Sequence, residues 1–397
     1  MSSVWDRLVG QDETVAALRA AADAAAAIAR GEQVAAGLLT HAWLFTGPAG
    51  SGRSVAARAF AAALQCSRLE QPGCGECTAC RTVLSGNHPD VKIVSTEGLS
   101  IGVEDMREMV KRSVSKPVMG RWSVIIVEDA DRLGERASNT LLKFVEEPPE
   151  RTIFMLCAPS THDDDISVTI RSRCRQLTLR TPPAAAVAAV LAADGLDTES
   201  AAWAAAAGQG HIGRSRRLAS DAVAREHRAA VLAIPGSLTS LRACMVAADH
   251  LIGSAEAEAA AMAADLDDKE TDELQIALGG GGTGKGTASA TRGTVGIMND
   301  LTKRQKRRKT RVQRDALDRA LIDLAAFYRD VLLVQSCAEV DPAHPDFDDE
   351  VRGVAVRVPP AGVLQRIDAV LSCREALDLN VKPRIAIEAL MAALRLP

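Results

Sequence analysis

The feature that most constrains this chain is a glycine-rich segment, residues 47–54, which reads Gly-Pro-Ala-Gly-Ser-Gly-Arg-Ser. A short apolar run, residues 42–45, precedes it, and a helix-like stretch, residues 55–64, follows. A strand, a glycine-rich loop and a helix in this order form a P-loop, where backbone N–H groups and the helix N-terminus bind phosphates. The candidate nucleotide-binding residues of this loop are Gly47, Gly50, Gly52, Arg53 and Ser54.

One position departs from the P-loop pattern. The pattern places lysine before the final hydroxyl residue, whereas this chain has Arg53. Lysine is a compact charge, and arginine is a wider planar group, so the exchange is not conservative at a tight phosphate site. The loop therefore predicts a bound nucleotide (ATP with Mg²⁺), and the exchange places its hydrolysis in doubt.

The composition sets broad limits on function. With 397 residues the chain is long enough for two or three domains. A net charge of −4 gives no overall signal for nucleic acid, so any basic surface must be local. Neither a signal-like start nor a membrane-length apolar run occurs, and we expect a cytoplasmic protein.

Four of the nine cysteines, Cys66, Cys74, Cys77 and Cys80, crowd into fifteen residues. Two residues between cysteines allow both thiolates to reach one tetrahedral ion, and four thiolates leave no open position. The spacing predicts a structural zinc site. An iron–sulfur cluster follows similar spacing, and a reduced loop without metal is the third interpretation.

Four strand-like segments cover residues 42–45, 91–94, 122–127 and 152–158, and acidic residues end the third of them. Glu128 and Asp129 follow the third segment, at the edge where parallel sheets bind ligands. In P-loop ATPases these positions hold Mg²⁺ and polarise water, usually in the order Asp-Glu. The inverted order here shifts both carboxylates by one methylene. Acids that merely end a strand are the alternative.

The pattern along the chain predicts three domains. Residues 1–180 form an α/β P-loop core with a parallel sheet and flanking helices, and the four-cysteine module (66–80) is inserted in it. Residues 181–240 form a helical lid, and residues 241–397 form an all-α domain. Residues 279–296, rich in glycine, predict a flexible loop, and residues 338–358 predict a second loop.

A basic run occupies residues 303–314, in which eight of twelve residues are Lys or Arg. Apolar residues at helical spacing follow it, so the run lies on a helix. A solvated helix face is one interpretation, and contact with nucleic-acid phosphates or an acidic partner is the other.

Taken together, five stretches resemble bacterial DNA polymerase III clamp-loader subunits of the AAA+ family, and most of all the delta-prime type. They are residues 41–47, the four cysteines, residues 88–90, residues 139–149 and residues 170–174. The resemblance covers roughly residues 5–240 and is thinner afterwards. It implies a RecA-like core, a lid and a C-terminal collar that joins five subunits in a hetero-pentamer.

The resemblance also implies partners and roles. The pentamer contains catalytic gamma/tau subunits and a delta subunit, opens the sliding clamp and loads it on primed DNA during replication. Arg173, in the triplet Ser172-Arg173-Cys174, would be an arginine finger that stabilises charge at a neighbour's ATP. The protein would be associated with the replisome at the nucleoid.

Departures from the pattern of active subunits cluster at the chain's own nucleotide site. Besides Arg53 and the inverted acids, Gly213 stands where an active subunit carries a sensing arginine, unless Arg214 replaces it. This combination favours an accessory subunit with little or no ATPase activity of its own. The alternative is a gamma/tau-like motor ATPase with an atypical P-loop.

Overall fold

The computed structural model describes residues 3–96, 98–104, 106–107, 117–277 and 291–396. Its compact units are residues 1–216 and residues 217–397. The boundary falls inside the segment that the sequence assigned to a lid, at 181–240. The three-domain division therefore stays a prediction.

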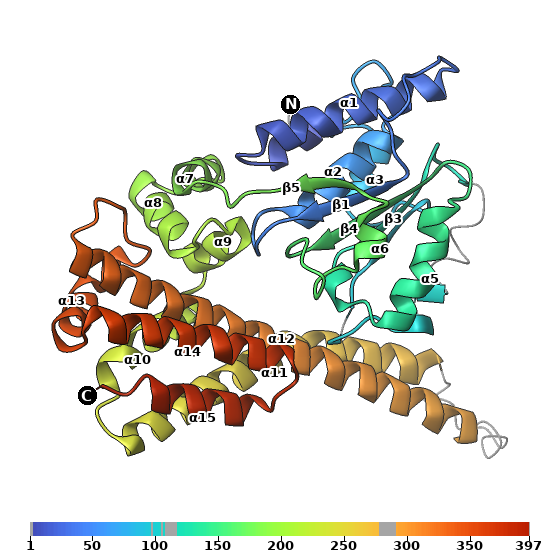
Figure 1. The fold of residues 1–397 in the computed structure, drawn as a ribbon. Coiled ribbons are helices and arrows are strands. Elements are labelled where there is room, and N and C mark those ends of the chain that lie inside the picture. Colours follow the sequence, from blue (N-terminus) through green and yellow to red (C-terminus); the bar gives the residue numbers. More distant parts are fainter. Residues whose placement is uncertain (1–2, 97, 105, 108–116, 278–290, 397) are drawn as a thin grey trace. The chain divides into compact units, whose positions relative to one another are not determined.

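A parallel five-stranded sheet forms the centre of the first unit (Figure 1). The strands are β1 (Ala42–Thr46), β2 (Val91–Val94), β3 (Ser123–Val127), β4 (Thr152–Ala158) and β5 (Arg175–Thr178), in the spatial order β2-β3-β4-β1-β5. Every residue of β1, β3 and β4 is buried, as expected for parallel strands covered on both faces. The α/β P-loop fold class predicted from sequence is confirmed, and β5 is a strand that the sequence analysis missed.

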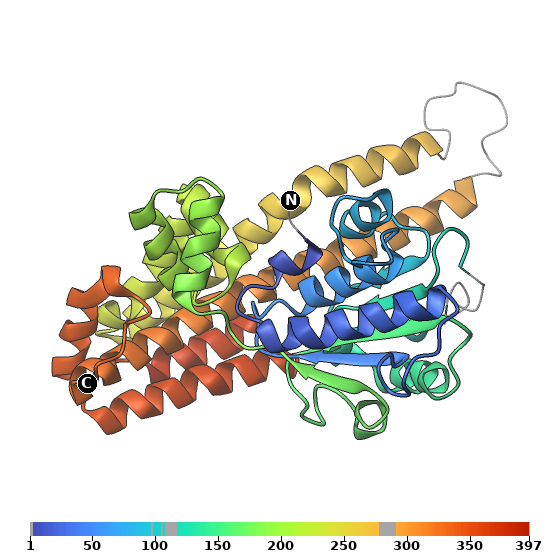
Figure 2. The same cartoon turned by 90° about the horizontal axis from the view of Figure 1, so that it is seen from above.

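Helices cover both faces of this sheet (Figures 1 and 2). Alternate strand residues divide the core in two: Trp43 and Phe45 pack with one set of helices, whereas Leu44 packs with the other. The first set is α1 (Asp12–Ala29), α2 (Arg53–Gln65) and α3 (Thr78–Leu84), together with the short helix η1 (Val4–Arg7). The second set is α5 (Glu135–Glu146) and α6 (Val168–Arg171), with η2 (Ala130–Arg132).

Three helices follow the sheet: α7 (Ala184–Ala193), α8 (Thr198–Ala207) and α9 (Ile212–Ser220). Alanines dominate the first two, and their buried small side chains allow close helix packing. The helix predicted from Ile101 to Ser113 falls largely on residues outside those described.

The second unit is all-α and is built on two long antiparallel helices, α11 (Leu241–Ala277) and α12 (Thr291–Ser336). The others are α10 (Ala222–Ser237), η3 (Pro345–Phe347), α13 (Asp348–Arg357), α14 (Pro360–Asp378) and α15 (Pro383–Ala393). One hydrophobic core joins them, with Leu317, Leu321, Phe327 and Tyr328 of α12 at its centre. None of the described helices is long and apolar enough to cross a membrane.

Two loop predictions in this unit need correction. The predicted flexible loop 279–296 is wrong at residues 291–296, which begin α12, and residues 278–290 lie outside the described part. Glycine costs about 1 kcal/mol in a helix interior, which is why glycine content alone favoured a loop. The predicted loop 338–358 is wrong at residues 348–357, which form α13, because Val351 and Val354 are buried in the core.

Candidate nucleotide and metal sites

The glycine-rich loop lies between the end of β1 and the start of α2, as the P-loop motif requires. Three glycines have positive φ: Gly47 (150°), Gly50 (85°) and Gly52 (93°). A Cβ at Gly47 would lie 2.4 Å from the carbonyl oxygen of Leu179, so no larger residue fits there. The loop therefore has the backbone geometry that lets N–H groups turn toward a phosphate.

A cavity of about 230 Å³ borders this loop. It is lined by residues 7–9 from the N-terminal segment, residues 50–55 of the loop, Pro182, and residues 211–213 of α9 and its approach. Pockets that enclose small ligands usually measure about 300–1,000 Å³. His211 contributes to this small volume, since a Cβ on Gly50 would lie 2.6 Å from the His211 Cβ.

Two polar atoms at the loop are buried without a hydrogen-bond partner among the described residues. They are Nη1 of Arg53 and Oγ of Ser51. A buried guanidinium nitrogen without a partner is costly, and an anion is the ligand that would satisfy it. This side of the site fits a phosphate group.

The acidic side of the site is different. Glu128 follows β3 and is 15% exposed, and Arg58 of α2 donates to its Oε1 over 2.9 Å from Nε and contacts the same oxygen over 2.8 Å from Nη2. Asp129 accepts a hydrogen bond from the backbone N–H of Thr96 at 3.4 Å. Because Arg58 already neutralises Glu128, this carboxylate is poorly suited to hold Mg²⁺ or to polarise water.

Sequence reasoning missed two residues of this site, Arg58 and His211. Arg58 lies seventy residues from Glu128, and no motif links them. His211 lies against the loop, and Gln11, buried, donates to the carbonyl oxygens of Ser51 and Arg180. Val9, in the same N-terminal turn as Gln11, lines the cavity. Gly213 lines it too, whereas Arg214 does not.

Arg173 follows the short helix α6 and is half-exposed, with 39% of its side chain accessible. Its Nη1 donates to the carbonyl oxygen of Thr169 at 2.9 Å, and its Nη2 lies 2.7 Å from Oε1 of Glu146, at the end of α5. These contacts hold the guanidinium near the surface.

The parallel sheet separates Arg173 from the P-loop. Trp43 pairs with Arg175, and Thr46 pairs with Thr178, so both strands run the same way. The P-loop follows the carboxyl end of β1, whereas Arg173 precedes the amino end of β5. The intervening length of strand is roughly 13 Å. Arg173 therefore lies at the opposite edge of the sheet from the chain's own P-loop.

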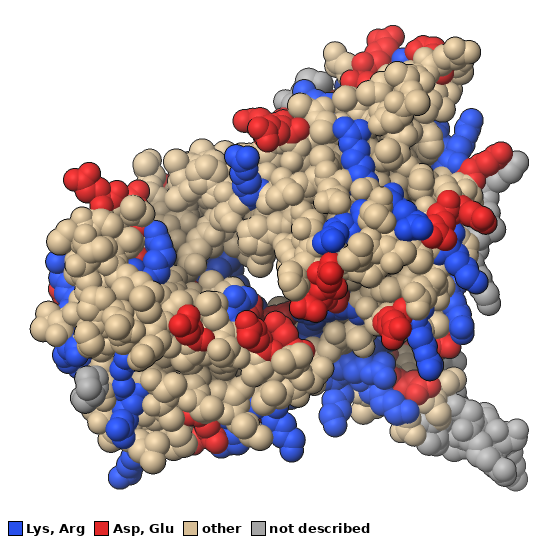
Figure 3. Space-filling model, in the orientation of Figure 1, with Lys and Arg blue, Asp and Glu red and all other residues tan. Residues whose placement is uncertain are grey.

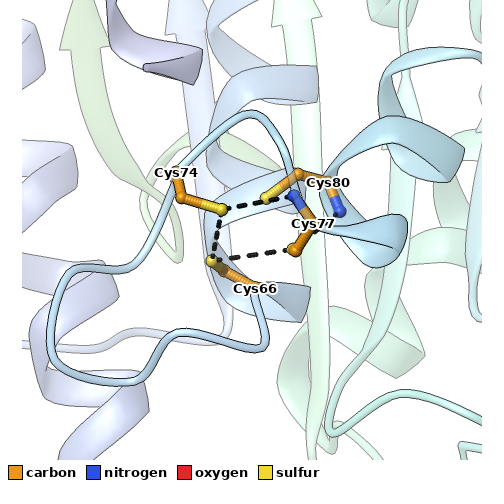
Figure 4. Close-up of side chains that lie close together, drawn as sticks. All are labelled: Cys66, Cys74, Cys77 and Cys80. Carbon is orange, nitrogen blue, oxygen red and sulfur yellow. Dashed lines mark hydrogen bonds between the residues drawn. The ribbon is translucent and has the colours of Figure 1, made fainter. Parts of the chain in front are cut away.

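The four cysteines come together as the spacing predicts, and their sulfur atoms all lie within 4.8 Å of one another (Figure 4). The Cys66 sulfur lies 3.6 Å from that of Cys74 and 4.0 Å from that of Cys77. Zn–S bonds of about 2.3 Å in a tetrahedron require sulfur atoms about 3.8 Å apart. The cluster therefore fits a metal ion such as zinc.

Local structure prepares these thiols for a cation. Cys77 is the N-cap of α3 and accepts from the backbone N–H of Cys80. A hydrogen bond between Cys66 and Cys80 lowers the pKa of the Cys66 thiol to about 4 and raises the pKa of Cys80. One thiolate is thus already favoured, and a divalent cation would stabilise the other three.

Known proteins match this chain within its first unit. Residues 25–183 match the family model described as "DNA polymerase III, delta subunit". The chain is 38% identical over 149 residues to a DNA polymerase III subunit delta' from Pseudomonas aeruginosa, covering 37% of this chain and 45% of that protein. It is 34% identical over 187 residues to a subunit gamma/tau from Mycobacterium tuberculosis, covering 47% of this chain and 30% of that protein.

The matched region thus spans less than half the length of either relative. A solved structure of a gamma-subunit-related protein from Thermotoga maritima covers 90% of this chain and 94% of that chain, with 15% identity and a TM-score of 0.39. That likeness is too distant to support an argument.

Proposed function

We propose that the chain is a clamp-loader subunit of the DNA polymerase III delta/delta-prime family and that its role within the loader is that of delta-prime. In this role it assembles with gamma/tau and delta subunits into a hetero-pentamer in the cytoplasm, associated with the replisome. That pentamer opens the sliding clamp and places it on primed DNA. The chain itself turns over little or no ATP.

The observation that carries the proposal is the contrast between the two edges of the sheet. At the carboxyl edge, Arg53 replaces lysine, and Arg58 forms an ion pair with Glu128, so this carboxylate is not available for catalysis in the chain's own site. At the amino edge, Arg173 is half-exposed and held by Glu146. An arginine so placed can reach the bound ATP of a neighbouring subunit and stabilise charge on the transferred phosphoryl group.

Zinc in the four-cysteine cluster would have a structural role. Four thiolates complete its coordination, so the ion would fix the segment between α2 and α3 and take no part in chemistry. The chain's own P-loop would bind nucleotide, because Nη1 of Arg53 favours a phosphate. It would not hydrolyse the nucleotide, because the carboxylate of Glu128 is paired with Arg58.

A second candidate, a gamma/tau-like motor ATPase, is favoured by the 34% identity with the Mycobacterium gamma/tau protein and by the intact P-loop glycines. The two candidates differ in where ATP is hydrolysed. In the first, the chain raises the ATPase activity of a partner; in the second, it hydrolyses ATP alone.

The test adds the purified chain to the gamma/tau ATPase of the same organism and measures steady-state phosphate release. Wild-type chain should stimulate the partner, Arg173→Ala should lose most of the stimulation, and Arg136→Ala, at another exposed arginine, should keep it. ATPase activity in the isolated chain, lost in Ser54→Ala, would instead support the motor candidate.

A further inference from the structure

The basic run 303–314 lies on α12 beyond the hydrophobic core of the second unit. That core reaches Ala255 on α11 and Ala316 on α12. Past these points the two helices continue as an antiparallel pair, which we call the arm: residues 256–277 of α11 and 297–315 of α12. A few small apolar contacts, among them Ala259, Ala263 and Leu301, are buried along it.

Some basic residues of the run have a structural role within the arm. Arg308 lies 2.7 Å from Asp267 and 2.5 Å from Glu270, and Arg304 lies 3.2 Å from Glu270. The hydrogen bond from Arg308 lowers the pKa of Glu270. These arginines face α11 and are matched by its acids, which explains part of the run without any partner.

Other basic residues of the run have side chains that are exposed to solvent. Lys306, Arg307 and Lys309 are exposed, and their side chains form no hydrogen bond or ion pair within the described residues. Lys303 is 69% exposed and lies 3.4 Å from Asp300 of the same helix. We call these four residues the basic stripe. Their helical positions place Lys306 opposite Arg304 and Arg308, with Lys303 and Lys309 on either side of it and Arg307 at the border with the face of Arg304.

The neighbours of the stripe indicate the kind of partner. Asn299, Thr302 and Thr310 share its face, so the exposed surface there is polar throughout. Protein interfaces usually have an apolar or aromatic centre, whereas nucleic-acid interfaces are polar and positively charged. Figure 3 shows Lys and Arg side chains gathered where Figure 1 draws the distal half of α12.

We propose that the basic stripe of the arm binds the phosphate backbone of DNA. The stripe extends roughly 10 Å along the helix axis, and a duplex carries about one charge per 1.7 Å, so each of the four cations can meet a phosphate. This surface is distant in sequence from the P-loop and from Arg173, and it does not depend on the delta-prime role.

The test measures binding of the full chain to a fluorescein-labelled DNA duplex, and to the same strand unpaired, by anisotropy over a range of salt concentrations. Four phosphate contacts predict a logarithmic salt slope of about −3.6 for duplex, which is about 150-fold weaker binding between 50 and 200 mM salt. The variant changes Lys303, Lys306, Arg307 and Lys309 to glutamine. It should bind at least about tenfold more weakly at low salt and lose most of the slope.

The matched control changes Arg242, Lys269, Arg357 and Lys382 to glutamine, four exposed residues of the same unit that alter the net charge equally. It should keep both affinity and slope. Glutamine is a good helix former, so both variants should melt at the wild-type temperature. Equal losses in the two variants, no effect of the stripe variant, or wild-type binding to an acidic polypeptide and not to DNA would each overturn the proposal.

Discussion

Arg58 and Glu128 form an ion pair of 2.8 Å. The arginine comes from the helix that the P-loop begins, and the glutamate comes from the end of β3. In an active ATPase this carboxylate would hold Mg²⁺ or polarise water. Under the proposed function, Arg58 is the basic group that keeps Glu128 from acting in the chain's own site.

This pair predicts that Arg58 and Glu128 are coupled in the free energy of unfolding and that neither affects ATP turnover. Since Glu128 is mostly buried and Arg58 is partly exposed, a double-mutant cycle of Arg58→Ala and Glu128→Ala should give about 1 kcal/mol of coupling in the free energy of unfolding. Urea denaturation measures it. Neither variant should alter ATP turnover in the isolated chain or in the loader. A loss of turnover on Glu128→Ala would mean that this carboxylate is catalytic.

Glu146 is expected to be a positioning residue for Arg173. It lies 2.7 Å from the guanidinium at the end of α5, so Glu146→Gln removes the ion pair and leaves a hydrogen-bond acceptor in place. Stimulation of the partner ATPase should fall by roughly a few-fold, less than on Arg173→Ala. If Glu146 only positions Arg173 for the reaction, the partner's kcat should fall in Glu146→Gln and its KM for ATP should stay constant. Glu147→Gln, one residue along, serves as the control and should leave both unchanged.

Metal removal should lower the stability of the chain and have no direct effect on ATP hydrolysis. The wild-type chain should contain about one zinc per molecule by elemental analysis after purification under reducing conditions, and Cys74→Ser should contain far less. A strong chelator should lower the wild-type melting temperature to that of the variant. Cys337→Ser, at an exposed cysteine outside the cluster, is the matched control and should keep its zinc. Equal zinc in all three proteins would place the metal elsewhere.

A buried histidine in the second unit predicts a pH dependence of stability. Burial lowers the pKa of His344, and its Nδ1 lies 3.0 Å from Nη2 of Arg228, which favours the neutral ring. Asp323 and Asp330 of α12 and Asp346 also contact this cluster, and they oppose the shift or pair with Arg228. The unfolded chain therefore binds a proton near pH 6.5 that the folded chain does not.

Stability should consequently fall as pH decreases below about 6.5, by up to about 1.4 kcal/mol per pH unit from this group. His344→Asn retains an acceptor for Arg228 and should remove that part of the slope in urea titrations between pH 7 and 5, values chosen to bracket the ordinary histidine pKa of about 6.5. His250→Asn, at an exposed histidine of α11, should keep the wild-type slope. An unchanged slope in His344→Asn would show that the ring has the same pKa in the folded and the unfolded chain, which would contradict this prediction.

The sequence predicted those parts of the molecule that local patterns encode. Three buried parallel strands are continuous apolar runs, and the P-loop and the cysteine spacing are motifs with a defined geometry. Strand β5 was missed because it lies at the sheet edge, where Arg175 and Leu177 are half-buried and Gln176 and Thr178 are exposed, so no apolar run announces it.

The remaining features depend on contacts between distant residues. The ion pair of Arg58 with Glu128 joins positions seventy residues apart. The basic run on α12 divides into residues paired with acids and exposed residues only when the acids of α11 lie beside it. Helix α13 was predicted as a loop because two prolines, Pro342 and Pro345, begin this stretch, although Val351 and Val354 beyond them are enough to bury one face of a helix.

The most direct test of the central claim compares two single substitutions in the complete loader, with clamp and primed DNA present. Ser54→Ala alters the chain's own P-loop, and Arg173→Ala alters the residue at the opposite edge of the sheet. The account predicts near-normal ATPase activity for Ser54→Ala and a loss of about a thousandfold or more at the partner site that Arg173 serves. Loss of activity in Ser54→Ala together with normal activity in Arg173→Ala would contradict it.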